Sequence, residues 1–443
     1  MLRPSLAVGA AFVAIASPSV FAQATAPSVF VSNDGNLEGS ITSFRLEADG
    51  SLTFVDRLVT GSRPSTSVAC GGCNTIRLSL TPNGRFLATV HAAGGTVEDV
   101  VVTAVAPDGT LSEVERLSAS EQGLDLQWVR DDLLAVATTT FGAGNLLRLY
   151  NWDGQDLTLA DADQAGEFFT DMELHPNGRW MYTNDSFQNT VRLFEISGSQ
   201  ATLVQTLSIP VFGSQLGVDP SGRYLYAAGG ISAGGNAFSG FTIDPSTGEL
   251  SLIVAGPGAG VFTSPGASPK NFAFVGDDLL YVGHGTDATV QGFRIDQATG
   301  VPTFTGVSFD VGTQGTLREM QGATVGGRDL LFVVDETDII DGLEGPYVFG
   351  VDAAGGLTAG PGSPTPTGGI SPEDVEVWGG AGPQPCNAAD IVPPFDLLTI
   401  QDVDGFIMAF VAGAPAADIA PTFGVIDVDD VDAFIAAFLG GCP

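Results

Sequence analysis

"MELHPNGRWMYTN", residues 172–184, is an apolar run, a Pro-Asn-Gly turn and a second apolar run. The same pattern occurs in "LSLTPNGRFLATV" (78–90) and "LGVDPSGRYLYAA" (216–228). Proline fixes φ near −65° and glycine adopts positive φ, so each stretch predicts two strands joined by a tight turn. Looser copies with the same apolar rhythm, "WVRDDLLAVA", "FVGDDLLYVG" and "VGGRDLLFVV", bring the total to six.

A second hairpin pattern follows each copy of the first: an alternating strand, a glycine turn and another strand. It occurs seven times, for example in "SFRLEADGSLTFVD" and "GFTIDPSTGELSLI". A period near fifty residues is the length of a four-stranded blade with its loops. The turn glycines are 44 to 59 residues apart, at Gly50, Gly109, Gly154, Gly198, Gly248, Gly300 and Gly355.

The unequal numbers of the two hairpins predict how the repeat closes. The N-terminal copy, which begins at "VFVSN", lacks its innermost strand, while "SPEDVEVW" (371–378) is an alternating strand with no followers. If that last strand joins the first blade, no sheet edge remains open. The sequence therefore predicts an all-β, seven-bladed β-propeller over residues 27–379 with a mixed closing blade.

The N-terminus predicts export. Residues 1–24 have a lone Arg3, an apolar run from Leu6 to Ala16 and small residues at Ala22 and Ala24, the pattern of a secretory signal peptide. No later stretch has the roughly 18 continuous apolar residues of a membrane span. We therefore expect a secreted protein without a transmembrane segment, in an extracellular, cell-surface or periplasmic location.

The charge balance excludes one class of partner. The 443 residues contain 51 acids and 16 bases, a formal net charge of −35, so nucleic acid is a poor partner. The acids are explained either by solubility in salty water or by bound divalent cations. Cysteines in an exported chain favour disulfides, in two local groups: Cys70 with Cys73, and Cys386 with Cys442.

In a propeller the innermost strands surround a central channel. Counting back from the turn of each blade, a polar residue begins an otherwise apolar strand every time. These residues either solvate a wet channel or form a site for a small-molecule ligand or metal. They are Arg77, Asp125, Asp171, Gln215, Asn271 beside Lys270, Gln321, and Asp374 beside Glu373.

Histidines are scarce, with His91, His175 and His284 the only three. His175 precedes a Pro-Asn-Gly turn and has two interpretations, a turn-stabilising residue or a catalytic one. No nucleophile elbow, paired-histidine zinc motif or phosphate loop is present. Cys70 and Cys73 have redox-motif spacing but no following helix, so a local disulfide is favoured.

The propeller resembles the lactonase family of seven-bladed propellers, relatives of 6-phosphogluconolactonase and of muconate-cyclising enzymes. The resemblance lies in "HPNGRWMYTND", the "IDPSTGELSL" hairpins and the seven-fold period. Members that hydrolyse lactones carry an Arg-His pair before "HPNG" and a glutamate after the next strand. Here Thr170 and Asp171 hold the pair's positions and Asp185 the glutamate's, so the resemblance implies the fold more strongly than the activity.

The C-terminal segment contains an internal repeat. "ADIVPPFDLLTIQDVDGFIMAFVAG" from Ala389 and "ADIAPTFGVIDVDDVDAFIAAFLGG" from Ala417 match at an offset of 28. Each ends in an apolar helix pattern, and two such helices are expected to pack together. The apolar faces are Val403, Phe406, Ile407, Phe410 and Val411, and Val431, Phe434, Ile435, Phe438 and Leu439. The stretch "GGAGPQP", which includes residues 380–385, predicts a flexible linker to this second domain, residues 386–443.

Acids recur before and within these helices. Helix capping and the helix dipole explain Thr399 and Asp427, but not the repeated acids that precede each loop. The tandem, its cysteines and "GGCP" resemble the dockerin-like domains that end many exported bacterial proteins. That resemblance implies an α-helical pair with two Ca²⁺ loops that docks to a protein receptor or cohesin-like partner. The implied ligands are Asp390, Thr399, Asp402, Asp418, Asp427 and Asp430.

Two functions follow from the sequence. The first is an exported binding or scaffold propeller anchored through the calcium-dependent module. The second is a secreted lactone hydrolase, a carboxylic ester hydrolase that uses the central channel. Its candidate catalytic residues are Asp125, Asp171, Asp374, Arg77 and His175.

Overall fold

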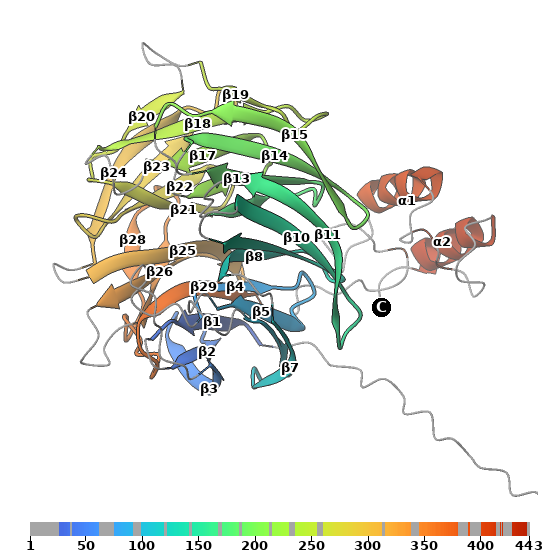
Figure 1. The fold of residues 1–443 in the computed structure, drawn as a ribbon, viewed down its shortest axis with the longest axis horizontal. Helices are drawn as coiled ribbons and strands as arrows, with labels where there is room; N and C mark the ends of the chain where they lie inside the picture. The colour runs from blue at the N-terminus through green and yellow to red at the C-terminus, as the bar shows by residue number, and fades with distance from the viewer. Residues whose placement is uncertain are drawn as a thin grey trace, which may run out of the picture.

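The computed structural model contains a ring of sheets and, apart from it, a pair of helices (Figure 1). The structure describes residues 26–35, 38–61, 75–91, 99–118, 122–140, 144–166, 171–185, 188–211, 215–229, 235–254, 260–311, 315–337, 345–379, 389, 400–412, 417, 419 and 428–440. The expected signal peptide, the linker and all four cysteines lie outside the described residues.

The described strands form seven antiparallel sheets, which we number as blades 1 to 7. Blade 1 consists of β29 (Pro372–Trp378), β1 (Ser28–Asn33), β2 (Gly39–Leu46) and β3 (Leu52–Gly61). Blade 2 consists of β4 (Arg77–Leu80), β5 (Phe86–Val90), β6 (Asp99–Val105) and β7 (Leu111–Ser118). Blade 3 consists of β8 (Gln122–Arg130), β9 (Leu133–Thr140), β10 (Gly144–Trp152) and β11 (Leu157–Gly166).

The remaining blades follow in chain order. Blade 4 consists of β12 (Met172–Leu174), β13 (Trp180–Asp185), β14 (Thr190–Ser197) and β15 (Gln200–Ser208). Blade 5 has five strands, β16 (Leu216–Val218), β17 (Tyr224–Ala228), β18 (Ala237–Ile243), β19 (Leu250–Leu252) and β20 (Val261–Thr263). Blade 6 consists of β21 (Pro269–Val275), β22 (Leu279–His284), β23 (Thr289–Ile295) and β24 (Pro302–Asp310). Blade 7 consists of β25 (Gly315–Val325), β26 (Arg328–Thr337), β27 (Gly345–Val351) and β28 (Leu357–Ala359).

The ring closes as the sequence predicts. The last strand, β29, pairs antiparallel with β1, with Val31 opposite Val375 and Phe30 opposite Glu376. The innermost strands then contact one another in sequence around the ring, in the order β4, β8, β12, β16, β21, β25 and β29. This closure leaves no innermost strand without a neighbouring blade, so the polar residues that begin these strands surround one axis.

The core consists of layers between successive blades. Because both faces of each sheet are covered, second strands such as Leu133–Thr140 read as nearly continuous apolar runs. Between blades 4 and 5, Trp180, Tyr182, Leu225 and Phe241 are buried in one such layer. These rigid layers fix the positions of the innermost strands.

His175 belongs to the scaffold of this ring. Its Nε2 is 2.9 Å from the carbonyl oxygen of Gly222 in the next blade, and its ring lies 4.7 Å from that of Trp180. Gly222 has φ of +69°, and a Cβ there would approach the His175 Nε2 to 2.5 Å. The turn-stabilising interpretation of His175 therefore agrees with the structure.

The helices α1 (Ile400–Ala412) and α2 (Val428–Gly440) pack through Phe406 and Phe434, whose ring centroids are 4.2 Å apart. The predicted apolar face is wider than the buried one, because Val411 and Leu439 are 81% and 80% exposed. One partner helix covers only a narrow stripe, so the flanking positions face solvent. Within the described part of the chain, neither helix is long and apolar enough to cross a membrane.

Candidate functional site

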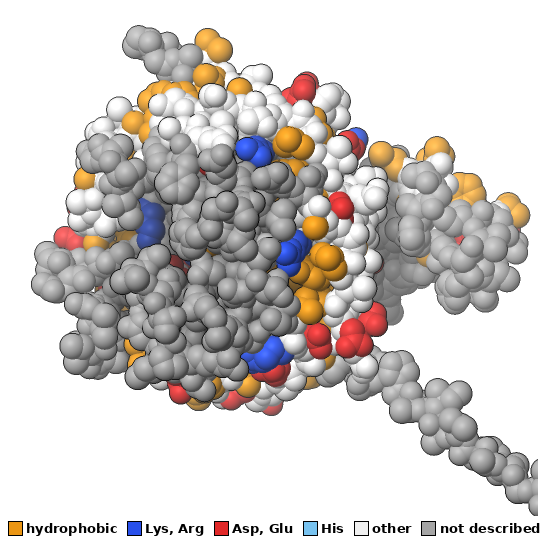
Figure 2. Space-filling view, in the orientation of Figure 1, with side chains coloured by type: hydrophobic (Ala, Val, Ile, Leu, Met, Phe, Trp, Pro, Cys, Tyr) orange, Lys and Arg blue, Asp and Glu red, His pale blue; other side chains and the backbone are white. Residues whose placement is uncertain are grey.

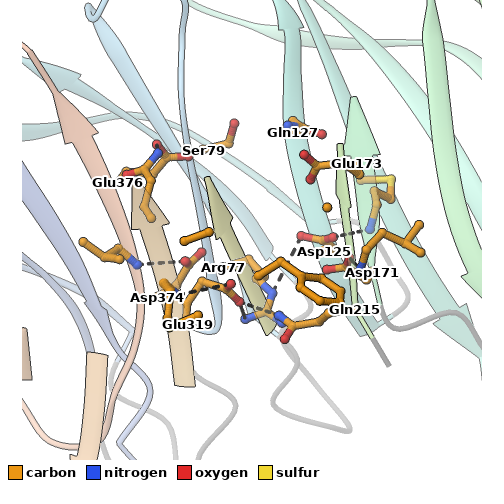
Figure 3. Close-up of a pocket in the computed structure, with 18 of the residues that line it drawn as sticks. Arg77, Ser79, Asp125, Gln127, Asp171, Glu173, Gln215, Glu319, Asp374 and Glu376 are labelled. Carbon is orange, nitrogen blue, oxygen red and sulfur yellow. Dashed lines mark hydrogen bonds and ion pairs between the residues drawn. The ribbon is translucent and has the colours of Figure 1, made fainter. Parts of the chain in front are cut away.

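The central channel holds a polar cavity of about 330 Å³ (Figure 3). Its polar lining forms two tiers, because a residue and the second one after it point to the same side of a strand. The upper tier, which begins the inner strands and lies in the lower part of the view in Figure 3, contains Arg77, Asp125, Asp171, Gln215, Glu319 and Asp374. The lower tier, which lies above it in that view, contains Ser79, Gln127, Glu173, Gln321 and Glu376.

Three upper-tier carboxylates each tie one blade to the next. In three blades, one carboxylate oxygen accepts a hydrogen bond from a backbone N–H of the following inner strand. The oxygens and donors are Asp374 Oδ2 and Leu78 N (2.7 Å), Asp125 Oδ2 and Met172 N (2.6 Å), and Asp171 Oδ2 and Leu216 N (2.6 Å). Charged acceptors make such bonds strong, so these aspartates have a structural role whatever else they do.

The lower tier repeats the arrangement two residues along each strand. Ser79 Oγ accepts from Trp128 N at 2.9 Å, and Gln127 Oε1 accepts from Leu174 N at 2.8 Å. Glu173 Oε1 lies 3.4 Å from Val218 N. Both tiers therefore join β8 to β12 and β12 to β16, and the lower tier also joins β4 to β8.

Arg77 is the main cation of the upper tier. Its guanidinium lies 3.5 Å from Glu319 Oε2, 3.8 Å from Asp125 Oδ1 and 3.9 Å from Glu373 Oε1. Burial alone would lower the pKa of Arg77, but the carboxylates of Glu319, Asp374 and Asp125 outweigh it and raise the pKa. Arg77 therefore stays charged and supplies the positive potential inside a ring of acids.

Burial shifts the acids toward their protonated forms. It raises the pKa of Asp125 to about 6, against the opposing effect of Arg77. Burial and the neighbouring Asp125 carboxylate raise the pKa of Asp171 well above its usual range. Burial also raises the pKa of Glu173 to about 8 and that of Glu376 to about 7. Adjacent carboxyls in the channel therefore hold protons with different strengths.

The structure brings together most of the predicted channel residues. Arg77, Asp125, Asp171, Gln215 and Asp374 all line the upper tier. In blades 6 and 7, two residues that were predicted to begin the channel strands do not lie in the upper tier. Asn271 does not line the cavity, and its side-chain amide instead donates to the carbonyl oxygen of Arg318. Gln321 lines the lower tier, where its Nε2 donates to Glu376 Oε2 at 3.1 Å.

Glu319 is the channel residue that counting back from the turn misses. Glu319 lies seven residues before the turn glycine Gly326, the spacing at which Asp171 precedes Gly178 and Gln215 precedes Gly222, whereas Gln321 lies only five residues before Gly326. Glu319 also accepts from the side-chain amide of Gln215 across the channel. The period of two would have found it, because an acid two residues before Gln321 matches Asp374 two residues before Glu376.

The other histidines lie away from the cavity lining. His91 Nε2 is 3.1 Å from Thr60 Oγ1 and 3.3 Å from Thr75 Oγ1. His284 Nε2 is 2.7 Å from Ser264 Oγ. Both rings are buried and held by hydroxyl groups. Neither provides a base for the channel.

Asp185, at the position of the family glutamate, is buried at the end of β13 and 3.8 Å from an Arg192 nitrogen. It does not line the cavity, and Thr170 lies outside the described residues. Among described residues, no group of three or more His, Cys, Asp or Glu side chains could hold a metal ion. The charged side chains that line the cavity, among the described residues, are carboxyl groups and the guanidinium of Arg77.

Comparison with known proteins gives a partial match. Part of the propeller matches the lactonase family. The family model, described as lactonase, 7-bladed β-propeller, matches residues 144–264 and 172–318. No curated protein matches the sequence.

Solved structures share the propeller. A candidate 6-phosphogluconolactonase from Bacteroides uniformis has 13% identity and a TM-score of 0.60, with 80% of this chain and 100% of that chain covered. The periplasmic gluconolactonase of Pseudomonas aeruginosa has 17% identity and a TM-score of 0.58, with 79% and 98% covered. A Lactobacillus plantarum protein has 16% identity and a TM-score of 0.60, with 80% and 99% covered. At these identities the similarity shows the fold alone.

The structure describes few of the C-terminal residues that are predicted to bind Ca²⁺. Asp390, Thr399, Asp418 and Asp427 lie outside the described residues. Asp402 lies in α1, where the backbone alone is described. Asp430 is fully buried at the start of α2, and its Oδ1 accepts from Ile419 N at 2.8 Å.

Proposed function

We propose that the propeller hydrolyses lactones in its central channel. The observation that carries the proposal is the pair of buried carboxyls Asp125 and Asp171, which differ in proton affinity and lie with Arg77 on a polar cavity. The lactonase-family match and the gluconolactonase among the similar structures support this function over a binding propeller without catalysis. The family's Arg-His pair is replaced, so the proposed machinery is particular to this chain.

Each group has a role that its environment favours. At neutral pH Asp125, with a pKa of about 6, is ionised and takes a proton from the attacking water as general base. Burial raises the pKa of Asp171, so this group keeps its proton and donates it to the ring oxygen as the acyl C–O bond breaks. Arg77 stabilises the negative charge that develops on the carbonyl oxygen. The product is an open-chain hydroxy acid.

The test measures the turnover of a lactone panel, which includes glucono-1,5-lactone, by the full-length chain. Turnover is followed by the protons that hydrolysis of the lactone releases. We expect Asp171→Asn to reduce kcat/KM at least a hundredfold, because the amide cannot deliver an acidic proton. The wild-type rate should rise with pH through about 6, as Asp125 ionises, and fall once Asp171 loses its proton.

A matched control is available on an outer strand. Asp161 also bridges two blades, since its Oδ1 accepts from Ala162 N and its Oδ2 accepts from Ala201 N of blade 4 at 2.8 Å. Asp161→Asn makes the same chemical change away from the channel and should leave turnover unaltered. Equal rates for Asp171→Asn and Asp161→Asn, with both variants folded by circular dichroism, would disprove the catalytic assignment.

We propose, as a second function, that the helix pair is a calcium-dependent docking module for a protein partner. The supporting observation is Asp430, a fully buried carboxylate at the position of a loop ligand. A buried carboxylate needs a compensating charge or hydrogen bonds, and Ca²⁺ prefers such oxygens. Asp402 and Asp430 would hold the two ions together with loop acids outside the described residues.

Exposed apolar side chains give this module a surface for a partner. They gather on the helices in Figure 2, and a folded monomer seldom exposes so many without a use. The exposed set is Ile407, Met408, Val411, Val428, Ile435 and Leu439.

Calcium binding is testable by isothermal titration of the full chain and of a chain that ends at residue 385. We expect the binding heat to disappear with the truncation and to halve in Asp430→Asn, because one of two loops is lost. Calcium binding that survives the truncation would assign the ion to the propeller and overturn this proposal.

A further inference from the structure

The lower tier of the channel has no part in the chemistry assigned to Arg77, Asp125 and Asp171. It lies two residues further along each inner strand, and a strand rises about 3.3 Å per residue, so roughly 6–7 Å separate the tiers. Both tiers line the same cavity of about 330 Å³, which is near the small end of the range for ligand pockets. A single sugar-sized ring that reacts at the upper tier therefore extends to the lower one.

The lower tier keeps hydrogen-bonding groups that no described protein atom uses. Gln127 Oε1 accepts from Leu174 N, but within the described part of the chain its Nε2 makes no hydrogen bond. Gln321 shows the reverse, because its Nε2 donates to Glu376 Oε2 while its Oε1 has no partner among the described residues. Both glutamines are half-buried on the cavity wall. An open donor and an open acceptor therefore line the same end of the cavity.

Glu173, on the next inner strand from Gln127, adds a third open atom (Figure 3). Its Oε1 lies 3.4 Å from Val218 N, and its Oε2 makes no hydrogen bond to any described residue. Burial raises the pKa of Glu173 to about 8, so at neutral pH this carboxyl keeps a proton that it can donate. The open groups of the lower tier thus include both hydrogen-bond donors and acceptors.

A buried amide in the upper tier also lacks a donor. Gln215 is 6% exposed, its Nε2 donates to Glu319, and its Oε1 has no partner among the described residues. A buried acceptor that has lost water without gaining a donor is unfavourable. The terminal torsion of a glutamine is broad, so a modest rotation turns this oxygen toward a hydroxyl in the cavity. The upper tier therefore also favours a ligand that carries hydrogen-bond donors.

The mixture of open groups favours hydroxyls over other polar groups. A hydroxyl both donates and accepts, whereas an ammonium only donates and a phosphate dianion only accepts. Charge favours the same ligand, because the titratable groups that the described lower tier contains are the carboxyls of Glu173 and Glu376. These carboxyls repel an anion once they ionise and offer it no counter-charge. The complementary ligand is an uncharged compound with several hydroxyl groups.

We propose that the lower tier is a subsite for substrate hydroxyls, so that the channel takes uncharged polyhydroxy lactones and not phosphorylated ones. The inference rests on the proposed lactone hydrolysis, which places the reacting ester at Asp125, Asp171 and Arg77. Gln127 donates to one hydroxyl of the ring, and Gln321 accepts from another. Both residues determine specificity, because they orient the ring and take no part in bond breaking.

The experiment compares three lactones as substrates of the full-length chain. Glucono-1,5-lactone has the hydroxyls, δ-valerolactone has the same ring without them, and 6-phosphoglucono-1,5-lactone adds a phosphate. Each kcat/KM is divided by the rate constant for hydrolysis by hydroxide, which removes differences in intrinsic reactivity. We expect glucono-1,5-lactone to be preferred about a hundredfold over δ-valerolactone and about tenfold over the phosphorylated lactone.

Gln127→Met replaces the amide with an apolar chain of similar length and removes the tie to Leu174 N. The preference for glucono-1,5-lactone over δ-valerolactone should fall about tenfold, chiefly through KM, because a contact to a substrate hydroxyl is lost. Gln205→Met is the matched control, since Gln205 Oε1 accepts from Leu250 N of the next blade at 2.8 Å on an outer strand. This control loses an equivalent tie and should keep the wild-type preference.

Binding of lactams separates this inference from the proposed hydrolysis. Glucono-1,5-lactam and δ-valerolactam have the hydroxyl patterns of the two uncharged lactones but resist hydrolysis, so isothermal titration measures their binding alone. We expect the gluconolactam to bind about tenfold more tightly, and Gln127→Met to remove that difference. This binding pattern without any lactone turnover would overturn the hydrolysis and support the subsite.

Three results would overturn the subsite. The first is lactone turnover without a normalised preference for glucono-1,5-lactone over δ-valerolactone, which would leave the hydrolysis intact. The second is an equal fall of that preference in Gln127→Met and Gln205→Met, with both variants folded by circular dichroism. The third is equal binding of the two lactams, or none. A normalised preference for the phosphorylated lactone would overturn the assignment to uncharged substrates.

Discussion

Successive blades are joined by polar ties in two regions, and the two sets differ in chemistry. In the upper tier of the channel the acceptor is a carboxylate, and the donor is a backbone N–H of the next inner strand. In the second region a tyrosine hydroxyl donates to the carbonyl oxygen of the glycine in the next blade's outer turn. The tyrosine ties, all at 2.8 Å, are Tyr182 to Gly248, Tyr226 to Gly300 and Tyr281 to Gly355.

The two sets occupy largely different blade boundaries. Carboxylates join blades 1 to 2, 3 to 4 and 4 to 5, while tyrosines join blades 4 to 5, 5 to 6 and 6 to 7. Blades 5 and 6 begin with Gln215 and Asn271, which have no carboxylate to offer. The tyrosine ties therefore hold the ring where channel carboxylates are absent.

The two sets of ties respond differently to pH, because only the carboxylates can gain or lose a proton. A neutral hydroxyl tie contributes about the same stability at every physiological pH, whereas a buried carboxylate changes its proton content with pH. Asp56 shows that a carboxylate tie does not need a channel, because its Oδ2 accepts from Leu111 N at 2.9 Å on the outer strands. A carboxylate can therefore join two blades without a channel, so the joining of blades does not explain why the acids cluster around Arg77.

Arg77→Met should have the largest effect on stability, because it removes the cation that the channel carboxylates share. Removal of this cation leaves Asp125, Glu319 and Glu373 without their shared guanidinium, so the free energy of unfolding should fall by about 3 kcal/mol or more. Urea unfolding followed by tryptophan fluorescence measures this change. All four tryptophans lie in the propeller, at Trp128, Trp152, Trp180 and Trp378, so the signal excludes the helix pair.

Arg45→Met is the matched control for that variant. Arg45 also contacts a carboxylate, Glu47 at 2.7 Å, but both side chains are substantially exposed. Its loss should cost less than about 1 kcal/mol. A similar cost for the two substitutions would mean that the channel cluster is no more than a solvated surface network.

The pH dependence of stability should distinguish the channel carboxylates from the neutral tyrosine ties. Burial raises the pKa of Glu173 to about 8 from an ordinary 4.5, so the folded state holds a proton that the unfolded chain has lost. Its stabilising contribution is complete below pH 4.5 and is lost as pH rises through 8. We expect the melting temperature to decline between pH 5 and pH 9, measured by differential scanning calorimetry.

Glu173→Gln should flatten that decline, because the amide keeps the acceptor for Val218 N but no longer titrates. Glu249→Gln makes the same change on an exposed outer turn and should leave the slope as it is in the wild type. A wild-type melting temperature that rises from pH 6 to pH 9 would contradict a channel of protonated acids.

The sequence predicts the ring well because its information is local and repeated. The Pro-Asn-Gly turns and the outer glycines set the hairpins, and the orphan strand at 371–378 predicts the closing pair that Val31 and Val375 form. Five predicted channel residues line the upper tier for the same reason, since the position that begins an inner strand is fixed by its turn.

Glu319 and Lys270 are the exceptions. Glu319 keeps the spacing of seven residues to its turn glycine, Gly326, that Gln215 keeps to Gly222, so a count that stops five residues from the turn selects Gln321 instead. Lys270 is identified in the sequence only as a neighbour of Asn271, because its partners Arg77, Arg318 and Glu373 come from three other blades. Proton affinities depend on this assembled environment, so the pairing of Asp125 with Asp171 is a property of the ring and not of either strand.

Tyr226→Phe tests the neutral set and has the smallest expected effect. It removes one hydroxyl and leaves the carbonyl oxygen of Gly300 without that donor, so the free energy of unfolding should fall by about 1 kcal/mol. Because the tie carries no charge, the loss should be equal at pH 5 and pH 9 in urea unfolding. A loss that changes with pH would show that the tyrosine ties are coupled to the channel acids, and the two regions would then form one network.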